Sequence, residues 1–220
     1  MLANYEEKFN EIRERIIHIA KGLVKANEII VEALTSCEVE KFNEAKEHIK
    51  NVSKITADID NMIVTTLALH SPEARDLRTM ISYLKITNEL LRAATNTRSF
   101  IKGFSEICIE VDVKTLKEYA IPMQRETVKA LTCMTHMISV DCVDEAQEQF
   151  NHVLICENKT DDLYEMIESS VLNNSNEISE FDKYHRMLSA LRKSEKIADR
   201  AMSIASLLLF AHVGGEIHQV

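Results

Sequence analysis

Apolar residues recur every three or four positions along almost the whole chain, which is the spacing that places them on one face of an α-helix. In the first stretch, Ile12, Ile16, Ile19 and Leu23 follow this spacing with charged residues between them, and they predict a helix over about residues 5–36. The same pattern predicts five more helices, over about 39–69, 72–100, 114–139, 143–172 and 178–213. We therefore expect six long helices.

Short polar or glycine-containing segments are expected to end these helices. Ser71 and Pro72 suit the cap and first residue of the third helix, because proline is tolerated where the backbone N–H needs no helical partner. Gly103 is expected to mark the break after that helix. Gly214 and Gly215 are expected to cap the last one, as glycine commonly does.

The two halves of the chain have matching patterns. At an offset of 104 residues, Ile59 falls on Leu163, Met62 on Met166 and Ile63 on Ile167 without a gap, and the predicted helix breaks also match. This favours a tandem duplication. The sequence predicts an all-α fold of two three-helix antiparallel bundles, built like spectrin repeats. The first bundle is expected over 1–104 and the second over 114–215, with a connection at 105–113 and a tail at 216–220.

Composition narrows the class of protein further. Four Gly and two Pro among 220 residues are too few for the turns of a many-stranded fold. Asp and Glu outnumber Lys and Arg by 35 to 26 without a basic cluster, which argues against nucleic-acid binding. No stretch of about 18 apolar residues could span a membrane. The first residues lack the basic-then-apolar layout of a signal peptide, so we expect a cytoplasmic protein that meets membranes only through partners.

The cysteines and histidines give no metal signature. Five Cys form no Cys-x-x-Cys pair and are expected to be reduced thiols, in keeping with the cytoplasm. Eight scattered His are expected to be packing or surface residues. Glycine-rich nucleotide loops and the Gly-x-Ser-x-Gly motif are missing from the sequence, and so are the paired Glu-x-x-His motifs of di-iron enzymes. These absences exclude nucleotide binding and α/β-hydrolase chemistry and argue against a di-iron oxidase, and we expect no catalytic or cofactor-binding residues.

Acidic residues on the last two predicted helices form the one candidate site. Glu195 and Asp199 lie one helical turn apart beside the apolar stripe of the last helix. The preceding helix carries acids at similar spacing: Glu157, Asp161, Asp162 and Glu165. Two such helices packed antiparallel could gather four to six carboxylate oxygens around a hard or borderline metal ion.

The same spacing also fits acids that simply face water. Acid pairs four residues apart are common on solvated helices, and Lys193, Lys196 and Arg200 are at hand to pair with them. From spacing alone this second interpretation is the commoner outcome, so both remain open.

Several segments resemble the PhoU family. They are 59–60 (ID), 71–78 (SPEARDLR), 84–86 (LKI) and 194–205 (SEKIADRAMSIA), the last of which is similar to that family's Glu-Arg-Ile-Gly-Asp signature with its Glu-x-x-x-Asp core. The tail 209–216 (LFAHVGGE), the length and the tandem repeat agree with this resemblance, which covers essentially the whole chain.

The resemblance implies a fold of two three-helix bundles and a non-enzymatic, cytoplasmic negative regulator of phosphate uptake. Such a protein is an adaptor between the ATPase subunit of a phosphate ABC transporter and a two-component sensor histidine kinase, and it associates as a homodimer. The resemblance also implies iron or zinc, bound through one Glu-x-x-x-Asp motif in each half.

The first half departs from the family pattern. Leu91 and Thr95 stand where the family has Glu and Asp, and only Asp58 and Asp60 remain nearby. We therefore expect the first-half site to be lost. A single metal site is expected in the second half, from Glu195, Asp199 and Asp162, with Asp161 as a further candidate. A carboxylate-bridged bundle for metal storage or metalloenzyme chemistry, and a purely structural scaffold, remain as alternatives.

Overall fold

The structure is a computed structural model that describes residues 2–174 and 178–214. These residues form helices joined by short connections, and the all-α prediction is confirmed. The elements are α1 (Leu2–Ser36), α2 (Val39–Glu47), α3 (Val52–Leu69), α4 (Ala74–Ile107), α5 (Val113–Thr115), the π-helical turn η1 (Leu116–Ala120), α6 (Ile121–Met137), α7 (Val143–Asn174) and α8 (Ile178–Val213). Gly215 and the predicted tail at 216–220 lie outside the described residues.

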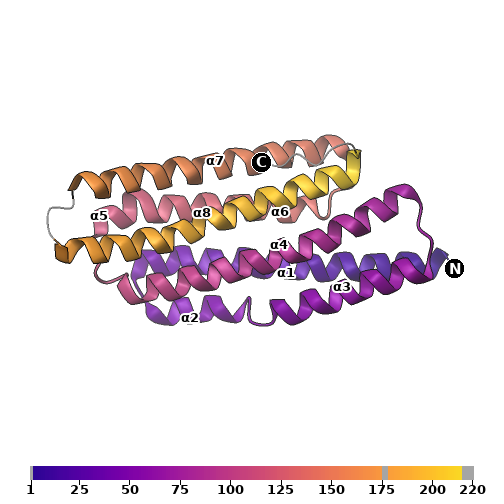
Figure 1. Ribbon diagram of the computed structural model, residues 1–220, viewed down its shortest axis with the longest axis horizontal. Helices are drawn as coiled ribbons and strands as arrows, with labels where there is room; N and C mark the ends of the chain where they lie inside the picture. Colours follow the sequence, from indigo (N-terminus) through magenta and orange to yellow (C-terminus); the bar gives the residue numbers. More distant parts are fainter. Residues whose placement is uncertain (1, 175–177, 215–220) are drawn as a thin grey trace.

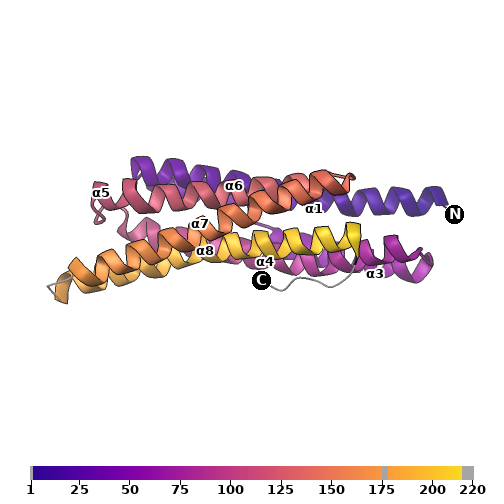
Figure 2. The same cartoon turned by 90° about the horizontal axis from the view of Figure 1, so that it is seen from above.

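The long helices run side by side along one axis (Figure 1). In the first half, α1 packs against α2, α3 and α4; in the second, α6, α7 and α8 pack against one another. The halves meet through two helix pairs, α1 with α6 and α4 with α8. Figure 2 shows that the two helices of each pair run in the same general direction along the body. Because α4 and α8 are the third long helices of their halves, this interface joins equivalent elements of the repeat.

The second predicted helix is interrupted, which corrects the expectation of one helix over 39–69. The chain leaves helical geometry between α2 and α3, where the carbonyl oxygen of Ile49 accepts a 2.6 Å hydrogen bond from the Arg98 side chain. The backbone there lies against Gly22 of α1: a Cβ atom on Gly22 would be 2.6 Å from the carbonyl oxygen of His48. The interruption is thus held by tertiary contacts, not by a local helix breaker.

The third long helix has different ends from those predicted. Its cap is Glu73 and its first residue Ala74, so Ser71 and Pro72 precede the helix. It also continues through Gly103 to Ile107, beyond the predicted boundaries at 100 and 104. Gly103 lies where α4 crosses α8: a Cβ atom on it would be 3.2 Å from the Cβ of Ala190. This glycine therefore permits close helix packing and does not end the helix.

The predicted glycine cap of the last helix is confirmed at Gly214. Its φ of 76° lies in the left-handed region, which favours glycine because that residue has no Cβ. Its N–H donates to the carbonyl oxygen of Phe210 over 2.9 Å, which satisfies one of the last carbonyls of α8.

Two of the five cysteines form a disulfide, which corrects the expectation that all are reduced. Cys37 follows α1 and Cys108 follows α4, and their Cα atoms are 5.7 Å apart although 71 residues separate them. The bond ties the C-terminal ends of two helices in the first bundle. Among the described helices, none is both long enough and apolar enough to cross a membrane.

Candidate metal centre

Acidic side chains from α7 and α8 converge on one cavity. Glu157 and Asp161 lie one turn apart on α7, and Glu195 and Asp199 lie one turn apart on α8. These four line a cavity of about 710 Å³, to which α4 also contributes Leu84, Lys85, Asn88 and Glu89. The antiparallel packing of α7 on α8 therefore brings both acid pairs together.

Three of these carboxylates are close enough to share one cation. Glu157, Asp161 and Asp199 each offer an oxygen atom, and the three atoms lie within 4.8 Å of one another. All three residues are half-buried. In the described part of the chain, no histidine or cysteine joins them, and no second group of three potential ligands is as compact.

Glu195 is the most buried acid of the cluster, with 7% of its surface exposed. The Arg192 guanidinium comes within 2.7 Å of its Oε2 atom, yet that oxygen accepts no well-aligned hydrogen bond. Burial raises the pKa of Glu195 to about 7; Arg192 opposes this effect, and the neighbouring Asp199 and Asp161 add to it. Near neutral pH this carboxyl is therefore poised between its protonated and charged forms.

Two more acids of the cluster have raised pKa values. Burial is the main cause for both Glu157 and Asp161, and the Asp199 carboxylate raises the pKa of each further. The Oδ1 atom of Asp161 is also buried without a hydrogen-bond partner. A cation among these groups would satisfy that oxygen and reduce the repulsion, so the residues fit a metal ion. A set of carboxylate oxygens suits hard cations and iron better than zinc, which more often takes nitrogen and sulfur ligands.

The structure brings together three of the four predicted site residues: Glu195, Asp199 and Asp161. Asp162 is exposed and borders a separate surface hollow with Tyr119. One residue along a helix is a rotation of about 100°, so Asp161 and Asp162 cannot both face α8. The prediction of Asp162 in this cluster is corrected.

Glu157 is the member that the predicted ligand set missed. It lies four residues before Asp161, the same spacing as that between Glu195 and Asp199. That shared spacing was the available signal, because acids four apart face the same way.

The corresponding positions in the first half carry no acids. Residues 104 positions before the four acids are Ser53, Ala57, Leu91 and Thr95. Asp58 is exposed, and Asp60 accepts a 2.6 Å hydrogen bond from the Thr87 hydroxyl. Neither aspartate belongs to a compact ligand group among the described residues.

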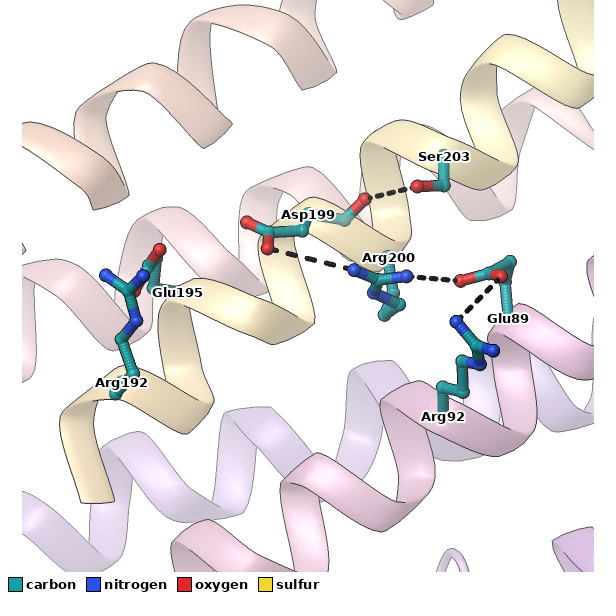
Figure 3. A network of polar contacts seen from close by, with 7 residues as sticks. All are labelled: Glu89, Arg92, Arg192, Glu195, Asp199, Arg200 and Ser203. Carbon is teal, nitrogen blue, oxygen red and sulfur yellow. Dashed lines mark hydrogen bonds and ion pairs between the residues drawn. The ribbon is translucent and has the colours of Figure 1, made fainter. Parts of the chain in front are cut away.

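Arg200 connects the acidic cluster to the other bundle (Figure 3). Its Nη2 atom lies 3.9 Å from Asp199 Oδ2, and its Nη1 atom donates over 2.9 Å to Glu89 on α4. Glu89 is in turn 3.8 Å from Arg92. The Ser203 hydroxyl donates to the backbone carbonyl oxygen of Asp199 over 2.9 Å. This chain of ion pairs links α8 to α4 across the interface between the halves.

Part of the chain is similar in sequence to known proteins. A family model described as the PhoU domain matches residues 16–101. The "Phosphate-specific transport system accessory protein PhoU homolog" of Aquifex aeolicus is 29% identical over 86 residues, and this match spans 39% of either chain. The matched region lies in the first half, whereas the acidic cluster lies in the second.

Solved structures extend the likeness to nearly the full chain. The crystal structure of PhoU from Pseudomonas aeruginosa superposes with a TM-score of 0.84 at 20% identity, over 96% of this chain and 100% of that one. The phosphate transport system regulatory protein PhoU from Streptococcus pneumoniae gives 0.80 at 15% identity, over 98% and 100%. At these identities the superpositions show the fold, and the PhoU domain match adds the sequence relationship. Over residues 16–101 the chain is similar in sequence to the PhoU domain, and its described residues share the fold of PhoU structures.

Proposed function

We propose that the chain is a regulator of phosphate transport that works by binding partner proteins and has no catalytic activity. The observation that carries the proposal is the PhoU domain over residues 16–101, set in a body that superposes along its length on PhoU structures. One of those relatives is named a phosphate transport system regulatory protein, and another a transport system accessory protein.

The proposed partners are the ATPase subunit of a phosphate ABC transporter and a sensor histidine kinase. In this role the protein is a negative regulator: bound to both, it keeps the kinase in its off state while phosphate is plentiful. The helices run side by side along a long body (Figures 1 and 2), which gives two partners room to bind at separate places. Association of the chain as a homodimer is part of the same proposal.

The second part of the proposal is that the acidic cluster binds a hard cation such as iron. The ligands are Glu157, Asp161 and Asp199, with Glu195 beside them. The support comes from their 4.8 Å clustering and from the buried Asp161 oxygen that lacks a partner. The ion would supply positive charge that joins α7 to α8. Arg200 and Glu89 connect that junction to α4.

Metal storage or a metal-dependent reaction is the second candidate function, and the same carboxylate cluster is what favours it. This alternative requires many ions per chain, or turnover of a substrate in the loaded protein. Regulation requires neither, so metal stoichiometry and assays of the loaded protein separate the two functions.

Gene deletion in the native host tests the regulatory proposal. We expect the deletion strain to express its phosphate-starvation genes and to take up phosphate rapidly in phosphate-rich medium. The wild-type gene should restore repression. Unchanged expression and uptake after deletion would refute the regulatory role.

Two matched variants test the metal part in the same strain. Asp161→Asn removes a carboxylate of the cluster, and Asp162→Asn removes the neighbouring exposed one. If the ion is needed for regulation, only Asp161→Asn should fail to restore repression. Equal repression by both variants would separate the regulatory role from the cation site.

A further inference from the structure

Arg192 holds the most buried acid of the cluster from the solvent side. It precedes Glu195 by three residues on α8, and its Nη1 atom lies 2.7 Å from Glu195 Oε2 (Figure 3). Its side chain is 46% exposed, against 10% for that of Glu195. A water-accessible cation is therefore in contact with a carboxylate that has little access to water.

The Arg192 guanidinium also has a second contact. Its central carbon lies 5.0 Å from the centre of the Tyr164 ring on α7, over the ring face. Cations are attracted to the face of an aromatic ring, and arginine favours this arrangement. The guanidinium can thus leave Glu195 and still keep a favourable contact at the edge of the cavity.

Arg200, the other arginine beside the cluster, is held differently. It pairs with Glu89 of the opposite bundle at 2.9 Å, and its side chain is 25% exposed. Its approach to Asp199 is longer, at 3.9 Å. Arg200 is thus held by Glu89, which lies outside the cluster, whereas Arg192 contacts Glu195, a member of the cluster.

A metal ion and the guanidinium compete for the same oxygen. Glu195 lines the same cavity as Glu157, Asp161 and Asp199, and an ion that took Glu195 Oε2 as a fourth ligand would compete with Arg192 for that oxygen. Two positive groups at contact distance in a half-buried site repel strongly, because there is little water to screen them.

We infer that Arg192 is an intramolecular competitor for the cation site. It neutralises Glu195 when no cation is bound, and it moves outward over Tyr164 when a cation takes Glu195 as a ligand. Its effect is to lower cation affinity, so that the site fills at a higher ion concentration than four free carboxylates would require. This inference rests on the proposed cation site.

Calorimetric titration with Mn²⁺, an air-stable hard cation, tests it. We expect Arg192→Gln to bind Mn²⁺ about tenfold more tightly than the wild type, the scale of one unit charge removed from contact distance in a partly screened site. Arg192→Lys keeps the charge and should stay near the wild-type affinity. Arg186→Gln removes an arginine of α8 that pairs with Glu106, away from the cluster, and controls for net charge.

Thermal unfolding supplies a second readout, in which the effect of Arg192→Gln on the unfolding temperature depends on whether Mn²⁺ is present. Without Mn²⁺, Arg192→Gln should unfold at a lower temperature than the wild type, because Glu195 loses its counter-ion. With saturating Mn²⁺, its upward shift should exceed that of the wild type. A variant that was merely misfolded would show the loss without the larger gain.

The outcomes separate the inference from the site on which it rests. If Arg192→Gln and the wild type bind Mn²⁺ equally and Asp161→Asn abolishes binding to both, the site stands and competition by Arg192 is refuted. Weaker binding by Arg192→Gln would make Arg192 a positioning residue for Glu195 and also refute it. If neither protein binds Mn²⁺, the proposed cation site fails and the inference falls with it.

Discussion

The side-chain amide of Gln124 on α6 donates a 2.7 Å hydrogen bond to the side-chain carbonyl of Asn27 on α1, and both residues are fully buried. The Ser194 hydroxyl of α8 donates to the other end of Gln124, also over 2.7 Å. Asn27 completes the set by donating to the carbonyl oxygen of Leu23 over 2.8 Å. The two bundles are therefore joined in their interior by oriented polar contacts as well as by apolar packing.

Replacing Gln124 with Leu should destabilise the protein. The change leaves Asn27 Oδ1 and the Ser194 hydroxyl without one partner each in a dry interior, which costs about 2–3 kcal/mol in the free energy of unfolding. Urea denaturation measures the loss. Gln147→Leu is the matched control, because Gln147 is exposed and should change stability by less than about 0.5 kcal/mol. Equal midpoints for the two variants would contradict the assigned role of the network.

Asp161 and Asp162 are neighbours on α7, but their substitution should affect metal binding very differently. Asp161→Asn should abolish binding of the proposed cation, because it takes a charge from a group whose oxygens lie within 4.8 Å of one another. Asp162→Asn should leave the metal content unchanged, because that side chain is exposed on another face. Elemental mass spectrometry of untagged protein, together with Mn²⁺ titration, makes the comparison. Loss of metal in Asp162→Asn would place the site elsewhere on α7.

Glu195 should couple the cation site and the fold to pH. Its pKa is raised to about 7, so in the folded protein it keeps its proton over a range in which the unfolded chain has lost it. Stability from this group is therefore greatest below about pH 4.3 and declines as pH rises toward about 7. The stability of Glu195→Gln relative to the wild type should accordingly increase over this interval.

The Glu195 carboxyl should give cation affinity a pH dependence opposite to that of stability. A ligand carboxyl must lose its proton before it coordinates a metal, so affinity for Mn²⁺ should rise with pH up to about 7 and binding should release protons. Titration in buffers of different ionisation enthalpy counts those protons. An affinity that is independent of pH between 5 and 8 would show that Glu195 is not a ligand.

Reducing the disulfide should loosen the first bundle. Cys37 and Cys108 close a loop with a sequence separation of 71 residues, and a loop of that length confers about 4 kcal/mol on the entropic model of cross-linking. Dithiothreitol, or the variant Cys37→Ser, should lower the urea midpoint accordingly. Cys142→Ser is the control, because Cys142 is exposed and unpaired. A midpoint unaffected by dithiothreitol would indicate that the two thiols are not bonded in solution.

Gly22→Ala should destabilise the protein although alanine is the better helix former. In an open helix this change gains about 1 kcal/mol. Here the new Cβ would lie 2.6 Å from the backbone oxygen of His48, so either α1 or the break between α2 and α3 must move. We expect a net loss of about 1–3 kcal/mol, as for other overpacked sites. An increase in thermal stability would show that the break is free to shift.

The helices could be predicted because their signal is local. An apolar stripe such as that of Ile12, Ile16 and Ile19 lies within one segment, and burying it requires only that some partner be present. The repeat followed from the same signal. The features that were missed or misplaced depend on which segments meet. Arg98 holds the break at Ile49 from another helix, and Gly103 faces a helix that follows it by about ninety residues.

The same difference between local signals and contacts between distant segments explains which residues of the candidate site could be predicted. The acids of α8 could be predicted because Glu195 lies on the buried stripe of its own helix. The choice between Glu157 and Asp162 depends on which side of α7 faces α8, and neighbouring acids make either side plausible from spacing alone. Cys37 and Cys108 are likewise brought together by the packing of α1 on α4, which no local pattern encodes.

Non-acidic residues, Ser53, Ala57, Leu91 and Thr95, stand at the first-half positions that correspond to the four acids, so the two halves of the molecule differ in charge pattern. A duplicated body with one cluster in each half presents the same charged feature twice, so a partner that recognises it can dock in two equivalent poses. With a single cluster, only one of those poses places the partner against it. This difference between the halves thus makes a nearly symmetric rod an oriented one, which suits the proposed link between two different partners.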